Sequence, residues 1–330
     1  MDVDPEILRD RALFLDRLPG YLLAEQAAVR LVDGIQVWGT PDPFSIATSW
    51  WGAPLSQRVL LSGDPADGSG RLSISTNSVR GIGDVVRARQ LVMGFAEQTT
   101  VALPLVSEAG VLSWHSAVAV DPGGLGRTFG KVRQVLRLQY QQVERTTSMF
   151  SVLLDGQPAV STPAEDCMLY LSFADAWGEV VDPSWELTAA DLASVREVVR
   201  ARGGEVLRAT PEGVIGGLLQ VGPVGAFDGD EMAEFVFMTD AVHENAGPSI
   251  FAVLTLPVYL EPAALYALNE AEVAEPAGSV LGTWCKSPVG EKACFLTFAP
   301  ERLSAHLSFS ELADLVASRA SWVGSVIRRQ

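Results

Sequence analysis

Apolar residues along the chain follow two spacings, one typical of α-helices and the other of β-strands. Large apolar side chains recur every three or four positions in residues 129–147 and again in residues 309–327, which predicts two long amphipathic helices. Shorter apolar runs of strand length are separated by clusters of Gly, Pro, Asp and Ser, which predicts paired strands joined by turns. The pattern therefore favours a fold of helices and antiparallel strands.

The first half predicts a helical amino-terminal region, a run of strands, a short helix, two more strands and one long helix. Asp4, Pro5 and Glu6 are typical of a helix start, because they supply a capping oxygen, a fixed φ and a negative charge. A short helix is expected at residues 84–93. The strands are expected at residues 35–38, 44–51, 58–62, 71–76, 100–106 and 111–120.

The second half predicts the same order of elements. Thr188 and Asp191 form a capping-box pattern, which predicts the start of a helix. A short helix is expected at residues 262–269. The strands are expected at residues 205–209, 214–221, 232–239, 250–257, 279–284 and 292–298. At an offset of 180 residues Phe129 falls on Phe309, and the apolar positions of the two long helices then coincide.

These patterns predict an α+β protein of two tandem lobes related by a pseudo-two-fold axis. Each lobe has the order α-β-β-β-(β)-α-β-β-α and an antiparallel sheet. The expected lobes are residues 1–155 and 167–330, and residues 156–166, which are rich in turn-forming and small side chains, are the expected linker. A covalent pair of lobes already satisfies its own interface, so we expect a monomer in solution.

Acidic residues outnumber basic ones by 40 to 24, which gives the 330-residue chain a formal net charge of −16. The acidic excess is three in residues 1–165 and thirteen in residues 166–330. Because clustered Lys and Arg bind nucleic acids and anionic membranes, neither is an expected partner. A basic client protein would suit this surface better.

Cysteine usage favours a reducing compartment. The three cysteines are Cys167, Cys285 and Cys294, and an odd number of thiols argues against a disulfide framework. The amino terminus is acidic where a secretory signal has a basic segment, and no apolar stretch approaches the roughly 18 residues of a membrane-spanning helix. We therefore expect a cytoplasmic protein.

No motif in the sequence predicts a catalytic site, a cofactor or a metal ion. Gly81 and Gly83 lack the third glycine of a dinucleotide-binding fingerprint. An enzyme whose groups come from distant positions remains as an alternative, and His306, Cys294 and Glu301 are its candidates. The favoured expectation is a protein that is not an enzyme.

Tryptophans are the main candidates for a binding surface. Trp51 follows Trp50, and adjacent strand residues point to opposite faces, so at least one of the two points away from its own core. Trp177 and Trp185 lie in a polar segment, and Trp284 ends a predicted strand. Aromatic side chains outside a core usually mark contact surfaces. We therefore expect Trp51, Trp177, Trp185 and Trp284 to stay accessible and to bind a peptide segment.

The element order, with Phe309-x-x-Leu312 in the closing helix and Phe129-x-x-Val132 in its counterpart, resembles the type III secretion chaperone and YbjN-like superfamily. The chain is most similar to actinobacterial proteins that carry this fold in tandem and are described as peptide-binding and chaperone-like. That resemblance implies a non-catalytic protein that holds an extended client segment along apolar grooves, without a nucleotide or other cofactor.

Two further binding functions remain open. A type VII secretion chaperone of the EspG kind is also two-lobed, but its client is a helical pair rather than an extended segment. A purely structural subunit of a larger assembly is the other class. An extended bound partner would indicate the type III-like chaperone, whereas a helical pair would indicate the type VII chaperone.

Overall fold

The computed structural model describes residues 45–50, 53–63, 70–99, 101–121, 123–159, 187–222, 232–243, 247–274, 278–287, 290–300, 303 and 306–327. The predicted amino-terminal helical region, the predicted strand at residues 35–38 and residues 160–166 of the expected linker lie outside the described residues.

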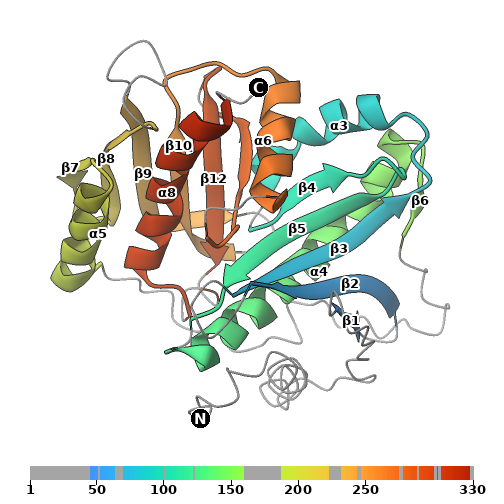
Figure 1. Cartoon of the computed structure of the whole chain (residues 1–330), viewed down its shortest axis with the longest axis horizontal. Coiled ribbons are helices and arrows are strands. Elements are labelled where there is room, and N and C mark those ends of the chain that lie inside the picture. The colour runs from blue at the N-terminus through green and yellow to red at the C-terminus, as the bar shows by residue number, and fades with distance from the viewer. Residues whose placement is uncertain are drawn as a thin grey trace. The chain divides into compact units, whose positions relative to one another are not determined.

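The protein has an α+β fold with antiparallel sheets, as the sequence predicts (Figure 1). The chain divides into two compact units. The first unit comprises residues 1–85 and 106–182, and the second comprises residues 86–105 and 183–330. Residues 86–105 thus belong to the second unit, although they precede the expected linker at residues 156–166 and were expected in the first lobe.

The first sheet has the strand order β1-β2-β3-β5-β4. Its strands span Ser45–Trp50 (β1), Ala53–Ser62 (β2), Arg71–Arg80 (β3), Leu103–Val106 (β4) and Leu112–Ala119 (β5). A two-residue strand, β6 (Gln157–Pro158), pairs with β3, so these two residues of the expected linker belong to the sheet. Helix α4 (Leu125–Leu153) packs against β3 and β5.

Helix α4 contacts the sheet through both apolar and polar side chains. Val132 and Leu136 are buried, as their helical spacing predicts. Gln139 lies on the same stripe and is also fully buried. Its amide accepts a hydrogen bond from Thr76 Oγ1 at 2.6 Å and donates one to Ser116 Oγ at 2.9 Å. These bonds satisfy a polar side chain that would otherwise be costly to bury.

The second sheet has the strand order β7-β8-β9-β10-β12-β11. Its strands span Glu205–Ala209 (β7), Val214–Gln220 (β8), Met232–His243 (β9), Gly247–Thr255 (β10), Thr283–Lys286 (β11) and Ala293–Pro300 (β12). Helices α5 (Ala189–Ala201), α6 (Pro262–Ala274) and α8 (Phe309–Ile327) belong to this unit. Helix α8 packs against α5 and against strands β8 and β10.

A segment from the first half of the sequence contributes to the second unit. It carries most of helix α3 (Val85–Met93) and the short 3₁₀ helix η2 (Ala96–Gln98). Arg89 Nη2 lies 3.5 Å from Glu270 Oε1, and its guanidinium covers the Tyr266 ring at 5.2 Å. Helix α3 therefore packs against α6 through an ion pair and a cation–π contact.

The two sheets share an order of strands. The first sheet, followed from β4, has the order β4-β5-β3-β2-β1, and the second has β11-β12-β10-β9-β8 with β7 added at its end. Equal orders are what two tandem lobes of one fold would have. A common origin of the two halves stays a prediction.

Gly217 allows strand β7 to lie close to β8. A Cβ atom at this position would lie 2.0 Å from the Glu205 carbonyl oxygen and 2.7 Å from the ring of Phe235, which is buried. At the neighbouring Gly216 the nearest atom would be Arg208 Nε at 3.1 Å, which belongs to a flexible side chain. The two glycines therefore differ sharply in the room they leave for a methyl group.

We expect Gly217→Ala to lower the free energy of unfolding by about 1–3 kcal/mol, because an edge strand and a buried ring must both shift. Gly216→Ala is the matched control and should cost clearly less. Urea unfolding followed by tryptophan fluorescence measures both values. Equal losses in the two variants would contradict the close approach of β7 at Gly217.

Candidate functional site

The candidate binding site is formed by helix α5 and strand β7. The capping box predicted for Thr188 and Asp191 is confirmed: Thr188 Oγ1 accepts from the Asp191 backbone N–H, and Asp191 Oδ2 accepts from the Thr188 backbone N–H, both at 3.1 Å. Val195 and Val199 are buried and anchor the helix. Gly203, with φ of +75°, follows the helix and turns the chain toward β7.

Strand β7 is the outer strand at one edge of the second sheet, and no described strand pairs with its free edge. Leu207 is 61% exposed, and Glu205, Arg208 and Ala209 are exposed as well. A β-bulge interrupts the pairing with β8 between Val206 and Arg208. An open edge of this kind presents backbone donors and acceptors to an incoming strand.

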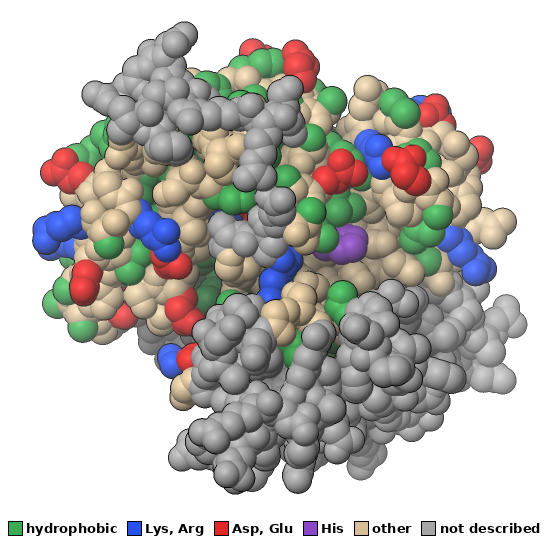
Figure 2. All heavy atoms as spheres, in the orientation of Figure 1, with side chains coloured by type: hydrophobic (Ala, Val, Ile, Leu, Met, Phe, Trp, Pro, Cys, Tyr) green, Lys and Arg blue, Asp and Glu red, His purple; other side chains and the backbone are tan. Residues whose placement is uncertain are grey.

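A groove of about 520 Å³ lies between α5 and β7. Its lining residues are Arg196, Arg200, Gly204, Glu205 and Val206. Arg196 and Arg200 are exposed, lie one helical turn apart and make no ion pair with a described residue. Figure 2 shows basic side chains at the surface over α5, at the left of the view. The groove thus carries two positive charges and one negative charge on a strongly acidic chain.

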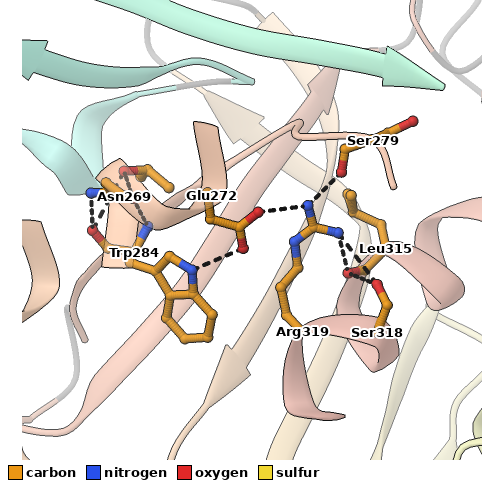
Figure 3. A network of polar contacts seen from close by, with 8 residues as sticks. Asn269, Glu272, Ser279, Trp284, Leu315, Ser318 and Arg319 are labelled. Carbon is orange, nitrogen blue, oxygen red and sulfur yellow. Dashed lines mark hydrogen bonds and ion pairs between the residues drawn. The ribbon is translucent and has the colours of Figure 1, made fainter. Parts of the chain in front are cut away.

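The interior of the second unit holds a buried ion pair (Figure 3). Arg319 Nη2 lies 3.1 Å from Glu272 Oε2, and both side chains are fully buried. Trp284 Nε1 donates to Glu272 Oε1 at 3.0 Å, so each carboxylate oxygen has a partner. The Arg319 guanidinium also donates to the backbone carbonyls of Leu315, at 2.9 Å, and Ser279. These contacts offset part of the cost of removing two charges from water.

Asn269 connects strand β11 to this ion pair. Its Oδ1 accepts from the Trp284 backbone N–H at 2.8 Å, and its Nδ2 donates to the Trp284 carbonyl oxygen at 3.0 Å. The Phe295 ring lies 5.4 Å from the Trp284 ring and 4.9 Å from the Arg319 guanidinium. The network therefore joins helices α6 and α8 to strands β11 and β12, which is a structural role.

The prediction that Trp284 stays accessible is wrong, because its side chain is fully buried. The indole N–H has an acceptor in Glu272, and the Trp322 ring stacks on the indole at 6.3 Å. Trp51, Trp177 and Trp185 lie outside the described residues. Their role in peptide binding stays a prediction.

The sequence contains a signal for the buried ion pair that the spacing of apolar residues alone does not show. Leu312, Val316 and Val323 mark the buried stripe of helix α8, and Arg319 falls on that stripe. A charged residue at a position that must be buried requires a buried partner. On α6, Glu272 likewise lies on the buried side of the helix, which also carries Leu265 and Leu268.

The dispersed residues considered for an enzyme are only partly described. Cys294 is buried in β12, and its Sγ lies 3.5 Å from Cys285 Sγ. His306 is half-buried just before α8, and Glu301 lies outside the described residues. Within the part of the chain that the structure describes, no group of three or more His, Cys, Asp and Glu side chains could hold a metal ion.

No protein-family model, curated protein or solved structure matches this chain. Among the described residues, no helix has the length and the apolar composition needed to cross a membrane.

Removing one partner of the buried ion pair is expected to be costly. Arg319→Met should lower the free energy of unfolding by about 3–5 kcal/mol, because the Glu272 carboxylate stays buried without its cation. The double variant Glu272→Gln/Arg319→Met keeps an acceptor for Trp284 and removes both charges, so it should recover more than half of that loss. Urea unfolding of both variants tests this. A double variant that is no more stable than Arg319→Met would contradict the pairing.

His115 on β5 is expected to make stability depend on pH. Burial lowers the pKa of His115 from 6.5 to about 4, so the folded chain disfavours the proton that the unfolded chain binds. The part of the unfolding free energy that depends on the His115 proton is therefore fully present above about pH 6.5. It is lost progressively as the pH drops toward 4. His115→Asn should flatten the unfolding free energy in this pH range, measured by urea unfolding. An unchanged pH profile would contradict the lowered pKa of His115.

Proposed function

We propose that the chain is a non-catalytic, chaperone-like protein that holds an extended segment of a client protein along strand β7. The observation that carries this proposal is the outer edge of β7, which no described strand pairs with and where Leu207 is exposed at a bulge. Backbone hydrogen bonds to such an edge give affinity without regard to sequence, and side-chain contacts beside it give selectivity.

The geometry of β7 limits the length of a guest strand. The strand has five residues and a β-bulge, and both features restrict edge-to-edge pairing to a short segment. Leu207 then serves as an apolar anchor, as residues in binding hot spots do. The groove between α5 and β7 supplies a place for side chains on the helix-facing side of the guest strand.

The charge of the groove favours an acidic client segment, in contrast to the basic client expected from the net charge. The screening length at physiological salt is about 8 Å, so a carboxylate in the groove interacts mainly with the charges nearest to it. Those charges are Arg196, Arg200 and Glu205. The distant acidic surface affects the rate of encounter more than the selectivity of the bound state.

The proposal also includes the family resemblance, the compartment and the oligomeric state expected from the sequence. The element order resembles tandem type III secretion chaperone and YbjN-like proteins, and the equal strand orders of the two sheets support two lobes of that kind. A cytoplasmic, monomeric protein without a cofactor fits this proposal. A type VII secretion chaperone, whose client is a helical pair, and a structural subunit are the alternatives.

Synthetic extended peptides test the site directly. A fluorescent peptide of alternating Val and Glu should bind more tightly than the matched peptide of alternating Val and Lys, measured by anisotropy. Leu207→Ser should weaken binding of the acidic peptide at least tenfold, because it removes the apolar anchor without changing the charge. Val242→Ser is the matched control, because Val242 is 76% exposed on β9 and does not line the groove.

The arginines of the groove need a control of equal charge change. Arg196→Glu/Arg200→Glu should weaken the acidic peptide at least tenfold, whereas Arg80→Glu/Arg145→Glu changes exposed arginines of the first unit and should have little effect. Equal losses in both double variants would indicate nonspecific attraction. Preferential binding of the basic or of a helical peptide, unaffected by Leu207→Ser, would overturn the proposed site.

A further inference from the structure

Cys285 and Cys294 form a pair of opposed thiols in the second sheet. The two residues are direct partners in the antiparallel register of β11 and β12. Their Sγ atoms lie 3.5 Å apart, and both side chains are buried. Directly opposed residues in antiparallel strands have Cα atoms roughly 4.5–5.5 Å apart, which lies within the range of about 4.4–6.8 Å that disulfides require. The backbone geometry therefore accommodates a bond between the two sulfurs.

We propose that Cys285 and Cys294 are a redox-active dithiol that closes into a disulfide by exchange with a low-molecular-weight disulfide. This inference does not depend on the proposed peptide-binding function. Oxidation would link the edge strand β11 to β12 in the register that the reduced protein already has. The pair then acts as a reversible staple beside Trp284 and the buried ion pair.

The exchange proceeds in two balanced steps. The Cys285 thiolate attacks one sulfur of the small disulfide, so a mixed disulfide forms and one small thiolate leaves. The Cys294 thiolate then attacks Cys285 Sγ, and a second small thiolate leaves. The protein loses two electrons and two protons, which the two released thiols carry.

The two steps differ in rate for structural reasons. The first is slow, because the hydrogen bond to Cys294 and burial raise the pKa of Cys285, and a reagent reaches it only when β11 opens locally. Cys285 lies one residue before the end of this four-residue edge strand, where such opening is easiest. The second step is fast, because the attacking sulfur already lies within 3.5 Å. The mixed disulfide should therefore not accumulate.

The test uses the full chain with Cys167→Ala, which leaves Cys285 and Cys294 as the only thiols. The reduced protein is incubated with oxidised glutathione, and free thiols are blocked before mass spectrometry. We expect the loss of two hydrogens and no glutathione adduct. Peptide mapping of the natural sequence should also find the Cys285–Cys294 bond, which covers the outcome in which the variant fails to fold.

Cys294→Ser in the same background is the matched control, and it should slowly accumulate the glutathione adduct on Cys285. Oxidation should also raise the melting temperature by several degrees and slow amide hydrogen exchange in β11 at least tenfold. Accumulation of the same adduct in the two-thiol protein would overturn the proposal. So would thiols that stay reduced in the folded chain while the urea-unfolded chain reacts.

Discussion

The buried pair of Glu272 and Arg319 is the constraint on which the second unit depends. Removing two charges from water costs several kcal/mol for each ion, and close pairing together with further hydrogen bonds must offset that cost. Each oxygen of Glu272 and two groups of the Arg319 guanidinium have partners. Because those partners come from α6, α8, β11 and the segment before it, the four elements must adopt one relative position.

The first unit also buries a polar side chain on its long helix, but this side chain is neutral. Gln139 on α4 and Arg319 on α8 are separated by the same offset of 180 residues that aligns Phe129 with Phe309. Both side chains are buried and polar, on stripes that are otherwise largely apolar. Gln139 bonds to Thr76 and Ser116 without a charged partner, so its burial is less costly. Equivalent helix positions thus carry polar groups of different charge.

Much of the fold could be predicted from local patterns. The capping box of Thr188 and Asp191 correctly placed the start of α5, and most strands lie within a few residues of their predicted ranges. Side-chain environments could not be predicted in this way. Trp284 ends no surface strand, because Asn269 and Glu272, which precede it by 15 and 12 residues, enclose it. Such pairings depend on the packing of α6 against β11, which the spacing of apolar residues does not encode.

The two edges of the second sheet differ in how they are completed, and the proposal that a client strand adds at β7 rests on this difference. At one edge, β11 contacts α6 and η2, Asn269 bonds to its backbone, and its central side chains are buried. At the other edge, β7 has exposed side chains and no described partner strand. A guest strand at β11 would have to displace a satisfied polar network, whereas at β7 no described strand would have to be displaced. Sequence alone did not identify this edge, since β7 was predicted as a strand like the others. Its outer position follows from the order of strands in the sheet. Leu207 is exposed on this strand, and the groove beside the strand is lined by two arginines of α5.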